Sequence, residues 1–277
     1  MAGQSDLRKD ATAPIIRECE CSRGSMQVYS GPEHSGSRIV AIAAALPVLR
    51  SSDAAAMSMT RVPAPWSLDG EGFILCYRFP RDPAAVEGLV PEPWRGCYLG
   101  GLGAVMLVDY RSSDVGPYRE LLVVPGRFRF RGQARFAITR IYVSTQESVF
   151  NGRENWGIPK DRADFHVSLP GDRSCRFVVR RGEDAIADVT LRTSGWGAPF
   201  TTALVPAPLR TLVQPAGDRL LATAPGGQGW VGLSGVDDAR VNGSLFPDFT
   251  RLPLLAAFHA RRFRLRFPAA RAFPAAA

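Results

Sequence analysis

From residue 73 onward the chain is a succession of short segments with strand character, and this pattern restricts the possible folds more than any other feature. In RFRFR (127–131) the arginines share one face of an extended chain and the phenylalanines share the other, and RFRLRF (262–267) alternates in the same way. Turn signals separate further strands, which we expect at 164–169, 175–181 and 185–193. Many short antiparallel strands with few helices predict a mainly β (α+β) fold, built on a curved sheet or a barrel.

Two short helices are expected between the strands. DPAAVEGL (82–89) offers Asp82 as an N-cap and a proline at the first helical position. QESVFNGREN (146–155) can form the second helix, which Gly157 and Pro159 would stop.

Two other segments carry weaker signals. RFAITRIYVST (135–145) reads as one continuous strand. The stretch from Pro206 to Gly235 is rich in proline and glycine, so we expect mostly loop with short strands.

The N-terminal part differs from the rest. Residues 1–58 are rich in Ser, Gly and Ala, show no lasting period, and are expected to be a disordered leader, with Met57 or Met59 as the natural start. We see no linker between residues 73 and 277, and residues 59–277 are expected to form one domain. The six basic and six acidic residues of 1–58 cancel, so the net charge of +8 lies in 59–277. Such a charge favours acidic partners or anionic substrates.

Several classes of protein are disfavoured. The longest apolar run, 39–49, is shorter than the roughly 20 residues of a membrane span. The five cysteines are irregularly spaced, which indicates reduced thiols in a cytoplasmic protein. No metal-ligand pattern occurs, and His166 and His259 are interpreted as half-buried strand residues. We therefore expect no metal site.

The arginine-rich strands are also compatible with a nucleic-acid face. Proteins that bind single strands combine a basic groove with aromatic side chains on the same face. Here the aromatic residues alternate with the arginines and would lie opposite them. We therefore interpret the arginines as a solvated sheet face or a subunit contact, and expect no nucleic-acid partner.

Lysine is almost absent from this chain. Of the 34 Lys and Arg residues, only Lys9 and Lys160 are lysines, which leaves 32 arginines. Arginine stays protonated and cannot serve as an amine nucleophile. A lysine retained in such a chain indicates chemistry, and the obvious chemistry is a Schiff base with a carbonyl substrate. A lysine left at the surface by chance is the alternative.

Three segments around this lysine resemble one family. GRENWGIPK (152–160) resembles the segment that carries the Schiff-base lysine of the acetoacetate decarboxylase family. CYRFPRDPAAVEGLVPEPW (76–94) resembles the first strand, short helix and V-P-E-P turn of that family, and GPYRELLVVPG (116–126) resembles the segment with its active-site glutamate. The resemblance covers roughly residues 63–200.

The resemblance implies a cone-like antiparallel β-barrel, a homo-oligomer and a small-molecule keto acid substrate. It implies that Lys160 is the nucleophile in an apolar pocket and that Glu120 orients the substrate or relays protons. In the family reaction the lysine condenses with the ketone of a β-keto acid, and CO₂ leaves from the imine without metal or cofactor.

Neighbouring residues would support this lysine. We expect Arg153 and Glu154 to pair and to hold the end of the helix that presents Lys160. Trp156 and Ile158 are expected to supply apolar walls, although ordinary core packing explains Trp156 equally well.

Two positions depart from the family pattern. Asp161 stands where the family has a second lysine, and a nearby carboxylate would raise the pKa of Lys160. Gly70 stands where the family has an arginine that handles the substrate carboxylate, and Arg78 or Arg119 are the candidates to replace it.

These departures keep two other functions open. An enamine formed from Lys160 could attack an aldehyde or lose water, which would make the protein an aldolase or dehydratase. Alternatively, the protein could bind a ligand or a partner without catalysis.

Overall fold

The computed structural model describes residues 59–277 except 87, 172, 194 and 276–277. The leader predicted at 1–58 lies outside this part of the chain. Among the described residues, no helix has the length and apolar character needed to cross a membrane.

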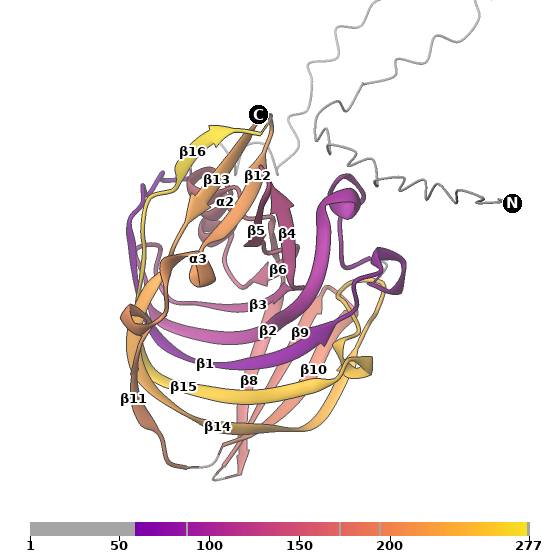
Figure 1. Ribbon diagram of the computed structural model, residues 1–277. Helices are drawn as coiled ribbons and strands as arrows, with labels where there is room; N and C mark the ends of the chain where they lie inside the picture. The colour runs from indigo at the N-terminus through magenta and orange to yellow at the C-terminus, as the bar shows by residue number, and fades with distance from the viewer. Residues whose placement is uncertain (1–58, 87, 172, 194, 276–277) are drawn as a thin grey trace, which may run out of the picture.

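Sixteen strands form one strongly curved, mostly antiparallel sheet (Figure 1). They are β1 (Trp66–Phe79), β2 (Tyr98–Ser112), β3 (Tyr118–Val124), β4 (Arg127–Phe130), β5 (Gln133–Phe136), β6 (Arg140–Val143), β7 (Lys160–Arg162), β8 (Asp164–Gly171), β9 (Ser174–Arg181), β10 (Asp184–Thr193), β11 (Ala198–Thr201), β12 (Leu212–Ala216), β13 (Arg219–Thr223), β14 (Gly226–Val241), β15 (Leu254–Phe267) and β16 (Arg271–Pro274).

The order of the main path is β16-β13-β12-β5-β4-β2-β1-β15-β14-β10-β9-β8. The mainly β fold with a curved antiparallel sheet is therefore confirmed, but the predicted barrel is wrong, because the terminal strands β16 and β8 do not pair in the described structure. The sheet branches at β2, whose first residues pair with β4 and whose later residues pair with β3. This branch leads through β3 and β6 to β7.

The second predicted helix is confirmed as α2 (Gln146–Trp156). The helix begins at Thr145, whose hydroxyl accepts a hydrogen bond from the backbone N–H of Ser148, and it ends at Gly157, which has a left-handed φ of 65°. The first predicted helix is only a single 3₁₀ turn, Pro83–Val86, which Asp82 caps by accepting from the N–H of Ala84.

Two weaker predictions are wrong. The strand predicted at 135–145 is divided, because Phe136 pairs with β4 whereas Arg140 pairs with β3. The stretch 206–235 is mostly strand: after the short helix α3 (Ala207–Arg210), a hairpin of β12 and β13 turns at Gly217 and β14 follows. Its glycines and prolines mark turns within a sheet rather than a long loop.

The core is divided between the two faces of the sheet, and β3 separates them. Leu121 and Val123 belong to one cluster, whereas Leu122 and Val124 belong to the other. The alternation in RFRF is confirmed, since Phe128 and Phe130 are buried while the arginines of β4 are exposed. In RFRLRF the arginines are likewise exposed and the apolar residues pack against the second cluster.

Candidate active site

Lys160 is the first residue of β7 and is presented by the end of α2. Gly157 reverses the chain after the helix, and β7 then pairs in parallel with β6, with Lys160 opposite Ile141. The side chain of Lys160 is directed inward and is only 4% exposed. The local sequence explains this geometry, because a left-handed glycine ends the helix and the following strand is fixed by its register with β6.

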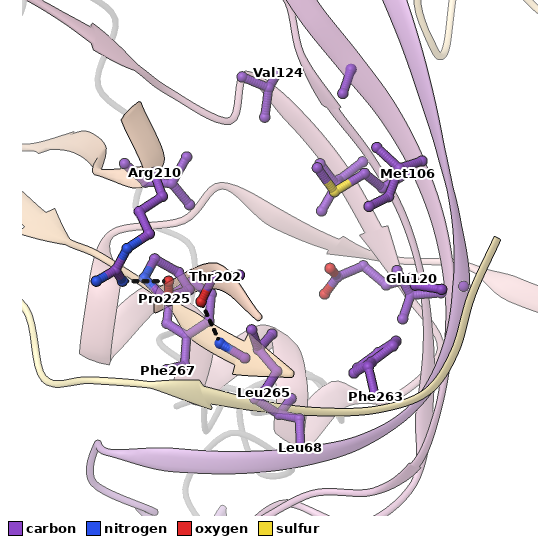
Figure 2. Close-up of a pocket in the computed structure, with 18 of the residues that line it drawn as sticks. Leu68, Met106, Glu120, Val124, Thr202, Arg210, Pro225, Phe263, Leu265 and Phe267 are labelled. Atoms are coloured by element: carbon purple, nitrogen blue, oxygen red, sulfur yellow. Dashed lines mark hydrogen bonds between the residues drawn. The ribbon is translucent and has the colours of Figure 1, made fainter. Parts of the chain in front are cut away.

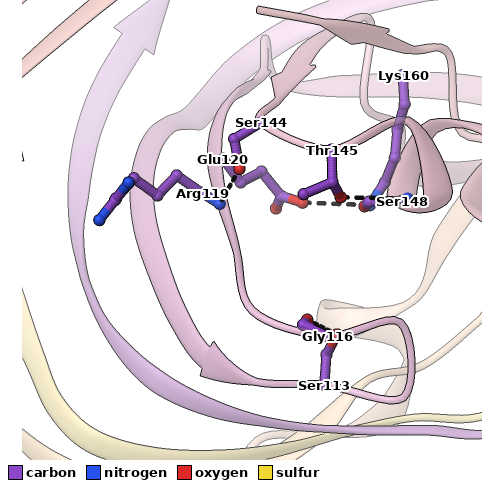
Figure 3. Close-up of polar contacts among 8 residues, drawn as sticks. All are labelled: Ser113, Gly116, Arg119, Glu120, Ser144, Thr145, Ser148 and Lys160. Atoms are coloured by element: carbon purple, nitrogen blue, oxygen red, sulfur yellow. Dashed lines mark hydrogen bonds and ion pairs between the residues drawn. The ribbon is translucent and has the colours of Figure 1, made fainter. Parts of the chain in front are cut away.

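Two polar side chains meet the Lys160 amine. Nζ lies 3.0 Å from Ser148 Oγ on α2 and 3.3 Å from Glu120 Oε2 on β3 (Figure 3). The amine also lies 5.0 Å from the centre of the Tyr118 ring. Glu120 is itself buried, so the two charges share a site from which water is largely excluded. The structure thus brings together the predicted nucleophile and the predicted glutamate.

Burial controls the protonation of this lysine. Desolvation lowers the pKa of Lys160 below its usual range, and the negative charge of Glu120 and its hydrogen bond oppose this shift. A lysine with an ordinary pKa is neutral in only about one molecule in 2,500 at pH 7. The apolar surroundings therefore increase the fraction of the nucleophilic amine.

The hydroxyl groups of Ser148, Tyr110 and Tyr118 extend the polar contacts, and no sequence pattern indicates any of the three. Tyr110 hydrogen bonds to Glu120, and Tyr118 hydrogen bonds to Ser148. Burial raises the pKa of both tyrosines, so they stay protonated at neutral pH. Tyr110 and Tyr118 are directly opposite each other on β2 and β3, a register that no local pattern reveals.

Asp161 lies away from the amine. Its carboxylate pairs with Arg153 at 2.6 Å, and both side chains are about half exposed. Successive residues of a strand point to opposite faces, so Lys160 is directed inward and Asp161 outward. The carboxylate that raises the pKa of Lys160 is therefore that of Glu120, and not that of Asp161 as expected.

The predicted pair of Arg153 and Glu154 does not form. Arg153 donates from Nε to the carbonyl of Lys160 at 2.8 Å, in addition to its pairing with Asp161. Glu154 instead pairs with Arg61 at 3.2 Å on the surface. Arg153 still connects the end of α2 to β7, as expected for a residue that holds the lysine in place.

Neither predicted arginine reaches the amine. Arg78 is exposed on β1, and its backbone N–H donates to Pro253. Arg119 lies 3.4 Å from Asp109 and extends away from the Glu120 carboxylate (Figure 3). Gly70 packs so closely on the backbone of Asp109 and Tyr110 that a side chain there would require the two strands to separate.

A cavity of about 470 Å³ opens in front of Lys160 and Glu120. Trp156 and Ile158 belong to its lining, as predicted, and Trp156 also stacks edge-on against Trp66. Figure 2 shows Glu120 and Met106 on one side of the cavity and Arg210 on another.

Arg210 and Arg264 are the guanidinium groups among the described lining residues. Arg264 pairs with Asp69, whereas Arg210 donates to the carbonyl oxygens of Ala224 and Pro225 and has no acidic partner among the described residues. Arg210 is therefore a further site residue that no sequence pattern indicates.

Other candidate groups lie elsewhere. His166 is exposed on β8, while His259 is buried on β15, and neither lines the cavity. The part of the chain that the structure describes contains no group of three or more His, Cys, Asp or Glu residues able to hold a metal ion. Of its cysteines, Cys97 and Cys175 are buried and Cys76 is partly buried.

Comparison with known proteins identifies the family of this chain. The family described as acetoacetate decarboxylase matches residues 45–210, which is more than half of the chain. Acetoacetate decarboxylase 1 of Bradyrhizobium diazoefficiens is 32% identical over 118 residues, and this match spans 40% of the chain but only 43% of the length of that relative.

Solved structures show the same fold. An acetoacetate decarboxylase from Legionella pneumophila aligns with a TM-score of 0.56 at 16% identity, covering 83% of this chain and 98% of that one. The enduracididine biosynthesis enzyme MppR, in a complex with the condensation product of pyruvate and imidazole 4-carboxaldehyde, aligns with a TM-score of 0.52 at 17% identity, covering 87% and 100%. The match to the family over residues 45–210 shows that the chain belongs to the acetoacetate decarboxylase family.

Proposed function

We propose that this protein is a Schiff-base-forming lyase that decarboxylates a β-keto acid through Lys160. The observation that carries the proposal is the buried amine itself, placed 3.3 Å from Glu120 at the wall of an apolar cavity. The decarboxylases among the relatives support the reaction type.

The reaction would begin with the neutral amine. Nζ of Lys160 attacks the keto carbon, and the carbinolamine loses water to give a protonated imine. The bond between the α-carbon and the carboxylate then breaks, and its electron pair moves into the imine to form a neutral enamine as CO₂ leaves. Protonation of the α-carbon restores the imine, and water releases the ketone and the free lysine.

Glu120 is suited to move the protons of this sequence. Its carboxylate lies within reach of Nζ, so it can accept a proton from the attacking amine and return one to the carbinolamine oxygen or to the enamine carbon. Ser148 accepts from Nζ at 3.0 Å and helps to keep the amine directed toward the cavity.

A second candidate function keeps the imine and changes its outcome. The close backbone approach at Gly70 leaves no room for an arginine at that position, so the carboxylate contact implied by the resemblance is missing. An enamine formed at Lys160 could then attack an aldehyde or lose water. The complex of MppR with a condensation product supports this alternative.

Borohydride trapping separates these functions. The protein is incubated with acetoacetate or with a panel of keto acids and aldehydes, reduced, and examined by mass spectrometry. An adduct at Lys160 together with CO₂ release supports the decarboxylase, and an adduct without CO₂ supports the aldolase or dehydratase. If no substrate gives an adduct and the Lys160→Arg protein behaves like the wild type, both enzyme functions are wrong.

We also infer a homo-oligomeric assembly. Phe200, Leu204, Leu209 and Trp230 are large apolar side chains that are 43%, 82%, 61% and 49% exposed. They belong to β11, α3, β14 and the turn that follows β11, and exposed apolar side chains in this number are typical of subunit contacts. Light scattering after size-exclusion chromatography measures the mass directly, and a monomer at micromolar concentration would contradict this inference.

A further inference from the structure

The wall of the cavity is polar beside Lys160 and becomes apolar farther along β3. Along β3, Glu120 is followed on the same face by Leu122 and Val124, and all three line the cavity. Each two-residue step along a strand covers about 7 Å, so Val124 lies about 14 Å along the strand from Glu120. An apolar wall therefore begins directly beside the reactive groups.

The neighbouring strands extend this apolar wall. On β2, Met106 is opposite Leu122 and Ala104 is opposite Val124, and both line the cavity. On the other side, Ile141 of β6 lies in register between Leu122 and Lys160. The apolar surface thus spans several strands. It starts with the residues that lie in register with Lys160 on the neighbouring strands.

The cavity is larger than a small keto acid requires. Acetoacetate has about seven non-hydrogen atoms and, even at the roughly 30 Å³ that a water molecule occupies in the liquid, takes up on the order of 200 Å³. The cavity volume of about 470 Å³ lies in the range of pockets that enclose ligands of drug size. A small polar substrate would leave much of the apolar wall facing water.

We propose that the substrate of this site is a β-keto acid whose keto carbon carries a long alkyl or an aryl group. The keto carbon meets Lys160, and the apolar group lies along Leu122, Val124, Met106 and Ala104. This inference rests on the proposed imine chemistry and adds the substrate class to it.

A homologous series of substrates tests the inference. CO₂ release is measured for β-keto acids from acetoacetate to 3-oxodecanoate, and for benzoylacetate. Burial of each methylene group is expected to raise kcat/KM about fourfold until the wall is covered. If acetoacetate is the best substrate, or if kcat/KM does not change with chain length, the inference is wrong.

A matched pair of variants locates the apolar group. Ala104→Phe fills the part of the cavity beside Val124, and it is expected to reduce the ratio of kcat/KM for 3-oxodecanoate to that for acetoacetate by about tenfold or more. Ala185→Phe makes the same change at an exposed position of β10 outside the cavity and keeps the ratio. An unchanged ratio in Ala104→Phe contradicts the assignment.

A binding experiment separates this inference from the imine chemistry. Lys160→Ala cannot form an imine, and calorimetric titration with methyl ketones from 2-butanone to 2-decanone reports on the cavity alone. Affinity that increases with chain length supports the substrate class even if borohydride traps nothing in the wild-type protein, which would contradict only the proposed function. Equal affinity for all ketones contradicts the substrate class, whatever the trapping experiment shows.

Discussion

A methyl group at Gly152 would lie 2.6 Å from Cδ and 2.8 Å from Cε of Lys160. Gly152 is in the interior of α2, where glycine is about 1 kcal/mol less favourable than alanine. Lys160 therefore occupies space that only glycine leaves open. A substitution at Gly152 is therefore expected to change the activity without lowering the stability.

Gly152→Ala is expected to keep or slightly raise the melting temperature and to slow imine formation. The added methyl group displaces a flexible side chain, which costs little stability but moves Nζ away from Glu120 and Ser148. A displacement of about 1 Å in a reacting group can cost on the order of a hundredfold in rate. Borohydride trapping rates and thermal unfolding measure the two effects. Gly171→Ala, at an exposed strand position with no atom near its Cβ, is the control. Equal trapping rates in the wild type and Gly152→Ala would contradict the prediction.

Glu120→Gln is expected to lower the pKa of Lys160 further. The carboxylate stabilises the ammonium form and opposes the shift that burial causes, so its removal favours the neutral amine. The pH dependence of Lys160 acylation, followed by mass spectrometry, should move to lower pH, while kcat falls because the proposed proton carrier is lost. Glu120→Asp retains the charge and serves as the comparison. A shift toward higher pH in Glu120→Gln is the contrary result.

Asp161→Asn is expected to leave the same pH profile unchanged. Asp161 points away from the amine and forms a half-exposed pair with Arg153, and pairs of this kind contribute about 0–1 kcal/mol to the free energy of unfolding. Arg153 keeps its hydrogen bond to the carbonyl of Lys160 in this variant. If the acylation profile moves to lower pH, Asp161 acts on the lysine after all.

The fold was predictable where the pattern was local. In RFRF the alternation alone identifies Phe128 and Phe130 as core residues, because a strand has only two faces. The open sheet was not predictable, because closure depends on whether β16 and β8 pair. No sequence segment indicates whether these two strands pair. The division of 135–145 likewise arises from two different partner strands.

The site was predictable only as far as the resemblance reached. Lys160 and Glu120 are 40 residues apart and meet through the pairing of β3, β6 and β7. Tyr110 reaches the site through the register of β2 with β3, and Arg210 reaches it because α3 returns the chain to the cavity. Neither residue has a local sequence signal. The absence of an Arg153–Glu154 pair follows from helix geometry, because adjacent residues on a helix do not face each other.

Arg210→Met is expected to raise KM for a keto acid about tenfold, which corresponds to about 1.4 kcal/mol. Arg210 faces the cavity with a positive charge that only backbone carbonyl oxygens accompany among the described residues. Its charge would attract a carboxylate but not a neutral ketone. Trapping of acetone at Lys160 therefore distinguishes a binding role from a structural one. If acetone trapping falls as much as keto acid turnover, Arg210 acts by holding the backbone at Ala224 and Pro225.

His259 is expected to make the fold sensitive to mild acid. It is buried on β15, stacked on Phe73, and its Nδ1 finds no hydrogen-bond partner in the described structure. Burial lowers the pKa of His259; Glu71, 3.8 Å away, opposes this, while Arg261 reinforces it. Because the folded-state pKa lies below the unfolded value of about 6.5, the unfolded chain binds the proton first. The free energy of unfolding should therefore decrease as the pH falls below about 6.5 toward the folded-state pKa.

His259→Phe tests this assignment, because phenylalanine can maintain the stacking and carries no proton. Urea unfolding at pH 7.5 and at pH 5 gives the change in free energy for each protein. We expect the free energy of unfolding to decrease less between pH 7.5 and pH 5 in His259→Phe than in the wild type. His166→Phe, at an exposed position of β8, is the matched control and should lose as much as the wild type. An equal acid loss in His259→Phe would show that the carboxylates, and not this histidine, set the acid sensitivity of the fold.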